Sequence, residues 1–210
     1  MKGSRKGVTR RDFLRRTAAA AFLTSAGFPT SAQEGAQTTS QQAQRAKVVL
    51  IRDKEALTEA GEPNGPVLGK MLDQAVATLL ETRDPLEAWK RLVKAEDTVG
   101  VKSNVWNYLP TPPALEAFIK QRLMDVGIRE DHISIDDRGI LGNPIFQDAT
   151  ALINVRPMRT HHWSGVGSLL KNYIVFDSHP PRWHDDSCAN LAGLWDLPII
   201  KGKTRLNILV

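Results

Sequence analysis

Apolar residues along the chain occur either in short unbroken runs or at helical spacing, and the two patterns alternate. The short runs, many of them rich in β-branched residues, predict five buried strands. They lie at residues 47–53, 97–106, 132–138, 149–155 and 203–210. Between these runs, apolar residues that recur every three or four positions predict helices. The predicted helices lie at residues 67–81, 85–93, 111–127, 165–176 and 187–195.

The order of these elements indicates the fold class. Strands that are separated by helices, and are apolar along most of their length, are typical of a parallel sheet covered on both faces. The pattern therefore predicts an α/β domain with a mostly parallel sheet and helices on both faces. The helix at residues 111–127 also has end signals, with Thr111 as N-cap, Pro112 in the first turn and Gly127 as C-terminal cap.

Polar residues gather where the predicted strands end, which is where parallel α/β sheets bind ligands. Three stretches fall on this edge, at residues 102–106, 136–138 and 156–167. Lys102 ends one strand there, and Asp136 and Asp137 end another. An amine or a carboxylate so placed suits acid–base chemistry, and the carboxylates could also bind a metal. The same residues could instead cap the following segments, and the sequence leaves both interpretations open.

The stretch from Asn154 to Asn172 has the residue types of an anion site. Arg156 and Arg159 bring fixed positive charges, and Lys171 adds a third. Two glycines, Gly165 and Gly167, indicate a helix start, where free backbone N–H groups favour an anion. This equipment suits a phosphate or a carboxylate, but neither a Walker A loop nor a GxGxxG fingerprint is present, so no nucleotide is indicated.

Other residues of that stretch have two interpretations. Ser164 could donate to an anion or cap the predicted helix, and His161 and His162 titrate near neutrality. In the alternative interpretation the glycines only form a turn and the arginines are solvated. Trp106, Trp163 and Trp183 lie in predicted loops, where they could line a pocket or cover the edge of a core.

Metal binding is a second hypothesis for the same region. His161, His184 and Cys188 are the candidate ligands, and His184 and Cys188 would share one face if a helix began early enough. The spacing lacks HExxH and CxxC, and the alternative is that Cys188 is a small core residue. Because Cys188 is the single cysteine, the chain can form no intramolecular disulfide and hold no cysteine-ligated iron–sulfur cluster by itself.

Charge is concentrated at the start of the chain. Residues 1–32 carry a net charge of +6 while the whole chain carries +5, so residues 33–210 carry −1. The basic isoelectric point therefore does not indicate a nucleic-acid partner, because the charge belongs to a leader that we expect to be removed.

That leader resembles a twin-arginine export signal. Arg10 and Arg11 precede Phe13 and Leu14, and an apolar stretch at residues 17–28 follows. This stretch has 12 residues, too few for a transmembrane helix, and cleavage after Ala32 fits the small residues there. We expect export by the twin-arginine translocase to the periplasm or beyond, with no membrane span in the mature chain. The alternative is an uncleaved basic anchor.

The leader also sets the expected domain organisation. Residues 1–32 would be the signal peptide, the polar residues 33–45 a linker, and residues 46–210 the α/β domain. Since twin-arginine export carries folded proteins, often loaded with a cofactor, it increases the expectation of a cofactor, whose nature is unknown.

Several motifs together resemble the family catalogued as domain of unknown function 362. These are VGVKSN (residues 99–104), ISIDD, the stretch INVRPMRTHHWSGVGSLLKN (residues 153–172) and the tail that begins at Cys188. The stretch at residues 153–172 matches the family pattern at Pro157, Arg159, Thr160, His161, Gly165, Val166, Leu170, Lys171 and Asn172. Here Arg159 and Ser164 replace the usual Lys and Thr, and family members generally continue past this last strand, which implies a domain truncated at its C-terminus.

The resemblance and the residue pattern lead to one expectation and one alternative. We expect an exported protein, enzyme-like or ligand-binding, that takes an anionic small molecule at the strand ends. The expected anion-binding residues are Arg159, Thr160, His161, Ser164, Gly165, Lys171, Asn172 and Asn104, and the catalytic candidates are Lys102, Asp136, His161 and Lys171. The alternative is a metal or redox accessory protein. Some family members carry an iron–sulfur domain, but this chain lacks those cysteines.

Overall fold

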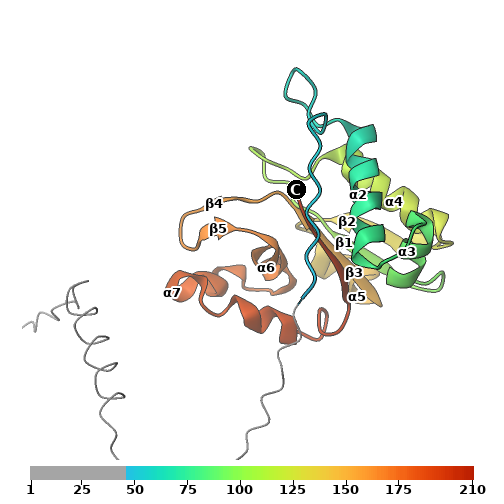
Figure 1. The fold of residues 1–210 in the computed structure, drawn as a ribbon. Helices are drawn as coiled ribbons and strands as arrows, with labels where there is room; N and C mark the ends of the chain where they lie inside the picture. The colour runs from blue at the N-terminus through green and yellow to red at the C-terminus, as the bar shows by residue number, and fades with distance from the viewer. Residues whose placement is uncertain (1–45) are drawn as a thin grey trace, which may run out of the picture. The chain divides into compact units, whose positions relative to one another are not determined.

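The computed structural model describes residues 46–210, which form one α/β unit (Figure 1). The predicted leader and linker, including Arg10 and Arg11, lie outside the described residues. In the described part of the chain, no helix is both long enough and apolar enough to span a membrane.

The centre of the unit is a four-stranded sheet in the order β2-β1-β3-β6, and every pair in it is parallel. Its strands are β1 (Val99–Lys102), β2 (Ile133–Asp136), β3 (Ala151–Arg156) and β6 (Thr204–Leu209). β1 and β3, the inner strands, are buried at every position, as expected for a parallel sheet with both faces covered. The predicted α/β fold class is confirmed.

Three helices cover one face of the sheet: α2 (Gly65–Leu79), α3 (Pro85–Leu92) and α4 (Pro113–Asp125). Trp89 of α3 is fully buried in this layer, and its indole N–H donates to Asp73 of α2 at 3.1 Å. Arg122 of α4 binds the same carboxylate, so one acidic side chain links the three helices. α3 begins as its sequence suggests, because the Asp84 side chain accepts from the N–H of Leu86 and caps the helix.

Shorter elements cover the other face. They are η2 (Ile140–Gly142), α5 (Pro144–Gln147), α6 (Leu169–Asn172), η3 (Tyr173–Phe176), η4 (Pro180–His184), α7 (Asp185–Cys188) and η5 (Leu191–Asp196). Phe146 and Tyr173, both fully buried, centre this second core. A side chain at Gly100 of β1 would approach the Phe146 ring to 2.7 Å, so a glycine lets α5 pack closely on the sheet. η1 (Glu130–His132) leads into β2.

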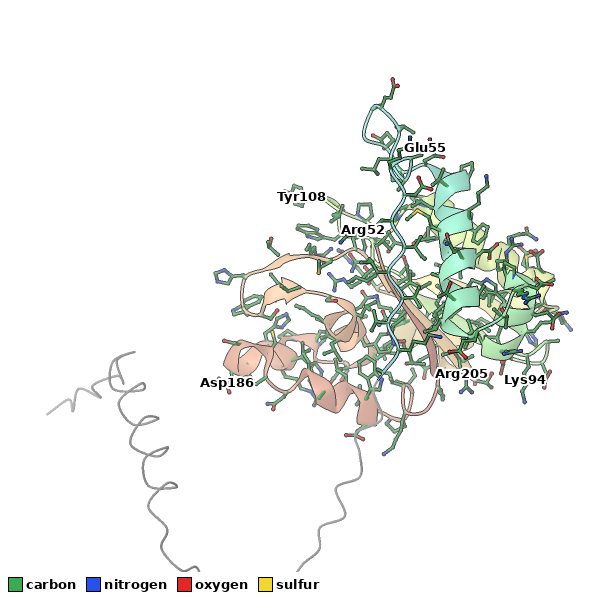
Figure 2. The ribbon with its side chains drawn as sticks, in the orientation of Figure 1. Arg52, Glu55, Lys94, Tyr108, Asp186 and Arg205 are labelled. Atoms are coloured by element: carbon green, nitrogen blue, oxygen red, sulfur yellow. The ribbon has the colours of Figure 1, made fainter. Side chains whose placement is uncertain are left out.

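The strand predicted at residues 47–53 is wrong. This segment is extended but forms no ladder, and Val48 and Leu50 are 87% and 72% exposed. Figure 2 shows Arg52 on this segment, which runs outside the layers. A β-branched run favours extended backbone, but a strand also needs a neighbour with free backbone groups, which no local pattern specifies.

Two further predictions of local structure are wrong. Thr111 does not cap α4, whose N-cap is Pro112. The Thr111 hydroxyl instead accepts a hydrogen bond from the N–H of Asn104 at 3.1 Å. The helix predicted at residues 165–176 begins later, because β4 (Arg159–His161) and β5 (Gly165–Gly167) form an antiparallel hairpin first. Gly165 has φ 71°, so it serves the hairpin turn and does not start a helix.

Candidate functional site

The carboxyl end of the sheet carries polar side chains on the face opposite to α2, α3 and α4. Along β3, Ile153 and Val155 point into the helix-covered core, and their neighbours Asn154 and Arg156 point to the other side. Lys102 of β1 lies beside Asn154 in the parallel register. Strand alternation therefore places an amine, an amide and a guanidinium together beneath α6.

A buried polar network, formed by Lys102, Asn104, Asp137, Asn154 and Asn172, lies at this end. Lys102 has no exposed surface, and its ammonium forms an ion pair with Asp137 and donates to the carbonyl of Ser103 at 2.6 Å. Burial lowers the pKa of Lys102 from 10.5 to about 8, while the Asp137 carboxylate acts in the opposite direction.

Asn172 of α6 connects this network to both inner strands. Its amide nitrogen donates to the Asn154 side chain at 2.9 Å and to the carbonyl of Lys102 at 3.2 Å. Its amide oxygen accepts from the Asn104 side chain at 3.2 Å. Asn104 in turn accepts from Arg159 at 2.8 Å, so the network fixes the guanidinium at the base of the hairpin.

Above the network, α6, the hairpin and the loops after β1 and β2 enclose a cleft of about 420 Å³. We call it the cationic cleft. Its lining residues are Asn104, Trp106, Asp137, Arg138, Arg156, Arg159, Thr160, His161, His162, Trp163, Lys171, Asn172, Ile174 and Val175. Arg138, Arg156, Arg159 and Lys171 bring four cationic groups, whereas Asp137 is the one carboxylate of the lining and is paired with Lys102.

Arg156 is the least exposed of these cations, at 3%. Its guanidinium donates only to the carbonyls of Pro157 and Ser168, both at 3.3 Å, and no ion pair to it occurs among residues 46–210. Burial and the neighbouring charge of Arg159 lower the pKa of Arg156 to about 10. Gly167 lies over the guanidinium, and a Cβ there would come within 3.4 Å of Nη2.

Arg159 is held by an aromatic ring as well as by Asn104. Its guanidinium carbon lies 4.1 Å from the centroid of the Trp106 ring, a cation–π contact. Trp106 in turn contacts Tyr108, which Figure 2 shows at the outer end of the loop after β1 and which is 84% exposed. Burial lowers the pKa of Arg159, and Asp137 partly offsets this effect.

His161 lies at the end of β4, inside the cluster of cations. Its Nδ1 is 2.9 Å from the hydroxyl of Ser164, and its ring stacks on His184 with centroids 5.7 Å apart. Burial, followed by the charges of Lys171, His184 and the two arginines, lowers the pKa of His161 to about 4. The imidazole is therefore neutral at pH 7.

Lys171 of α6 reaches into the cleft from the opposite side. Its ammonium nitrogen is 2.7 Å from Nε2 of His184, which ends η4. Burial lowers the pKa of Lys171, Cys188 partly offsets this effect, and the charges of Arg156 and Arg159 lower the pKa further.

The structure brings most of the predicted site residues together. Asn104, Arg159, Thr160, His161, Lys171 and Asn172 line the cationic cleft, and Lys102 supports it from below. Ser164 and Gly165 do not line it. Ser164 forms hydrogen bonds within the hairpin, to His161 and to the carbonyl of Val166.

Asp136 has a structural role in this arrangement. Its carboxylate accepts from the N–H of Asp137 at 2.7 Å and of Gly139 at 3.4 Å, which stabilises the turn after β2. The neighbouring Asp137 is the residue that faces the cleft. The sequence places both aspartates at the strand end, and only the folded turn shows which of the two faces the cleft.

Arg138 and Arg156 also line the cleft, although the expected anion-binding residues did not include Arg138, and Arg156 entered only as one of the positive charges of the stretch. Strand alternation beyond Asn154 was the signal for Arg156. For Arg138 the signal was its position directly after the predicted strand, in the stretch at residues 136–138.

The three metal candidates are placed differently from the expectation. His184 ends η4 and Cys188 ends α7, but Asp186 and Ser187 between them have φ of 46° and 57°, so the two do not share a regular helix face. Cys188 is buried. Within residues 46–210, no three His, Cys, Asp or Glu side chains form a group that could hold a metal ion.

The low pKa of His161 leads to a prediction. Because the cause includes nearby cations, an anion bound in the cleft should raise the pKa of His161 from about 4 toward its ordinary value. NMR titration of the ring protons, with and without 50-fold excess (about saturating) phosphate, measures this shift. The same titration with an equal concentration of chloride in place of phosphate is the control and should leave the His161 curve unmoved. An unmoved His161 curve with phosphate would contradict an anion at this position.

The fold and the cleft define the class: an α/β protein with a cationic cleft at the carboxyl edge of a parallel sheet. No protein-family model, no curated protein and no solved structure matches the chain. The resemblance to the family of domain of unknown function 362 therefore stays a prediction from the motifs.

Proposed function

We propose that this protein binds a small anion, with a carboxylate or phosphate group, in the cationic cleft. The observation behind this proposal is the buried guanidinium of Arg156, which has no carboxylate partner among the described residues. Burying a charge without a counter-ion costs free energy, and a bound anion supplies the missing counter-ion.

The rest of the lining supports the same class of ligand. Arg159 and Lys171 approach from two sides, and the carboxylate of Asp137 is already neutralised by Lys102. Arginine forms paired hydrogen bonds to the oxygens of carboxylates and phosphates. Trp106, Trp163, Ile174 and Val175 offer apolar surface for the remainder of the molecule, which favours a small organic anion.

Tryptophan fluorescence tests the proposal, because Trp106 and Trp163 line the cleft and all five tryptophans lie within residues 46–210. We expect a saturable change when the full chain is titrated with inorganic phosphate or lactate. Arg159→Gln removes a charged donor and should weaken binding about tenfold or more. Arg129→Gln is the matched control, since Arg129 is exposed and pairs with Asp131. Equal affinities in both variants would refute the proposal.

We also propose that the protein is exported folded through the twin-arginine translocase. Arg10, Arg11 and the apolar stretch at residues 17–28 support this proposal, as does the concentration of positive charge before residue 33. The mature protein would then meet its ligand in the periplasm or outside the cell.

Replacing both arginines by lysine, in an Arg10→Lys/Arg11→Lys variant, is expected to abolish export, because the translocase reads the arginine pair and not only its charge. Fractionation and immunoblotting of an exporting host should then show precursor in the cytoplasm and no mature protein outside it. Arg15→Lys/Arg16→Lys keeps the same charge away from the pair and should be exported normally. Undiminished export of the first variant would show that the leader works by another route.

The alternative, a metal or redox accessory protein, stays a prediction from the sequence. Elemental analysis of protein purified from an exporting host tests this alternative, and a stoichiometric amount of metal would support it.

A further inference from the structure

Lys171 is the lysine among the lining residues of the cationic cleft, and its surroundings differ from those of an ordinary surface lysine. No carboxylate lies within 4.0 Å of its ammonium nitrogen in the described part of the chain. Arg156 and Arg159 line the same cleft, and among the described residues Lys171 has one hydrogen-bond partner, Nε2 of His184 at 2.7 Å. Lys102, by contrast, is fully buried and paired with Asp137, so no ligand can reach it.

The hydrogen bonds of His184 define what it offers to Lys171. Its Nδ1 lies 3.1 Å from the carbonyl oxygen of Pro181, which can only accept, so Nδ1 carries the hydrogen. Nε2 of the neutral ring then has its lone pair directed at Lys171. The rings of His161 and Trp163, with centroids 5.7 Å and 4.7 Å away, hold the imidazole in this orientation.

The two nitrogens therefore share one proton. Either the ammonium donates to a neutral imidazole, or a neutral amine accepts from an imidazolium. Both groups cannot be protonated at 2.7 Å, because two donors would then face each other. Burial lowers the pKa of Lys171, Cys188 acts in the opposite direction, and the charges of Arg156 and Arg159 add to the lowering because they disfavour a third cation in the cleft. An uncharged lysine amine is a nucleophile.

We propose that Lys171 forms an imine with the carbonyl group of a 2-oxo acid whose carboxylate is bound by Arg156 and Arg159, with His184 as its proton acceptor and donor. This inference rests on the anion-binding function proposed above and names the substrate class of the same cleft. A 2-oxo acid carries an anion and a carbonyl on adjacent carbons, which matches two guanidinium groups and an amine that share one small cleft.

The step balances without an oxidant or a further reactant. His184 takes one proton from the Lys171 ammonium, and the free amine lone pair forms a C–N bond to the carbonyl carbon. The carbon–oxygen π electrons move to oxygen, and after proton transfer from nitrogen a neutral carbinolamine results. The His184 imidazolium then protonates the hydroxyl, the C–O bond breaks, and water leaves. The products are a protonated imine, water and neutral His184. In the imine, a C–C or C–H bond next to the former carbonyl carbon is weakened.

Reductive trapping tests the inference. The full chain is incubated with pyruvate and sodium cyanoborohydride, digested, and mapped by mass spectrometry. We expect carboxyethyl adduct at Lys171 to exceed that at Lys120 by about tenfold or more, since Lys120 is exposed and bound to Glu130. Acetone, which lacks the carboxylate, should not label Lys171 preferentially, and lactate, which lacks the carbonyl, should compete with pyruvate.

Two variants separate chemistry from binding. Lys171→Arg keeps the charge but cannot form an imine, so adduct at this position is lost while lactate affinity falls by less than about tenfold. His184→Gln keeps an acceptor for Lys171 but cannot carry the proton, so adduct formation should slow by about tenfold or more while lactate still binds.

The outcomes are distinguishable. If lactate and phosphate bind but pyruvate labels Lys171 no more than Lys120, the imine is refuted and the anion-binding function stands. If neither lactate nor phosphate binds, the proposed function itself fails. Trapping in His184→Gln as fast as in the parent would refute the role of His184.

Discussion

Arg156→Met is expected to abolish anion binding in the cationic cleft while leaving the fold at least as stable as the parent. Arg156 is 3% exposed, and its charge is met by two carbonyl oxygens and no carboxylate in the described residues. Burial and Arg159 lower its pKa to about 10, which means that the folded protein disfavours this charge. Methionine fills similar space without the charge.

The variant is expected to bind anions more weakly without a loss of stability. Loss of two charged hydrogen bonds to an anion weakens binding by about 100-fold or more. Removal of an uncompensated buried charge leaves the free energy of unfolding unchanged or raises it by about 1–3 kcal/mol. Fluorescence titration and urea unfolding measure the two effects, and Arg91→Met, on the far helix layer, should alter neither by a comparable amount.

A stability loss in Arg156→Met with unchanged affinity would contradict this account. Arg156 would then be a structural residue whose carbonyl contacts matter more than its charge. Arg156→Lys gives an intermediate case, since it keeps a positive charge but cannot form the paired hydrogen bonds of a guanidinium.

Lys102→Met is expected to lower the free energy of unfolding by about 3–5 kcal/mol, because removal of one partner leaves the other charge buried. Lys102 has no exposed surface, and once its ion pair is lost Asp137 keeps the N–H of Val105, at 2.9 Å, and the more distant guanidinium of Arg138, at 4.0 Å. The network that holds Asn104 and Arg159 would loosen with it, so anion affinity should fall as well.

Lys120→Met is the matched control for this prediction. Lys120 also forms an ion pair with a carboxylate, that of Glu130, but both side chains are exposed. Loss of this pair should therefore change the free energy of unfolding by about 0–1 kcal/mol. The double variant Lys102→Met/Asp137→Leu removes both charges and should recover part of the loss. Equal stabilities of Lys102→Met and Lys120→Met, measured by urea unfolding, would show that the buried pair contributes nothing specific.

The sheet could be predicted from the sequence because buried parallel strands have a simple sequence pattern. β1 and β3 are buried on both faces, so their residues form apolar runs that the sequence shows directly. The run at residues 47–53 also contains consecutive apolar residues and is not a strand, since composition does not say whether a neighbouring strand is present to pair with it.

The hairpin β4–β5 could not be predicted from its composition. It consists of three-residue strands joined by a turn of His162, Trp163 and Ser164, and the two glycines of β5 fit a helix start equally well. Its formation changes the roles of the residues around it. Ser164 forms its hydrogen bonds within the hairpin. The positive charge in the cleft comes from the side chains of Arg156, Arg159 and Lys171, and not from backbone N–H groups at a helix start as expected.

Placement at the strand ends was predictable, but the pairing of charges was not. The rule for parallel sheets located Lys102, Arg156 and Arg159 at one edge. Which aspartate neutralises Lys102, and that Arg156 keeps no counter-ion in the described residues, depend on side-chain directions that only the folded chain defines. These two facts are the ones that favour an anion.

The most direct test of the central claim is a crystal structure of the full chain grown with inorganic phosphate above its measured dissociation constant. The account predicts phosphate in the cationic cleft, with oxygens within hydrogen-bond distance of the Arg156 and Arg159 guanidinium groups and of the Lys171 ammonium. A cleft that holds only water under these conditions, or phosphate bound elsewhere on the surface, would contradict it.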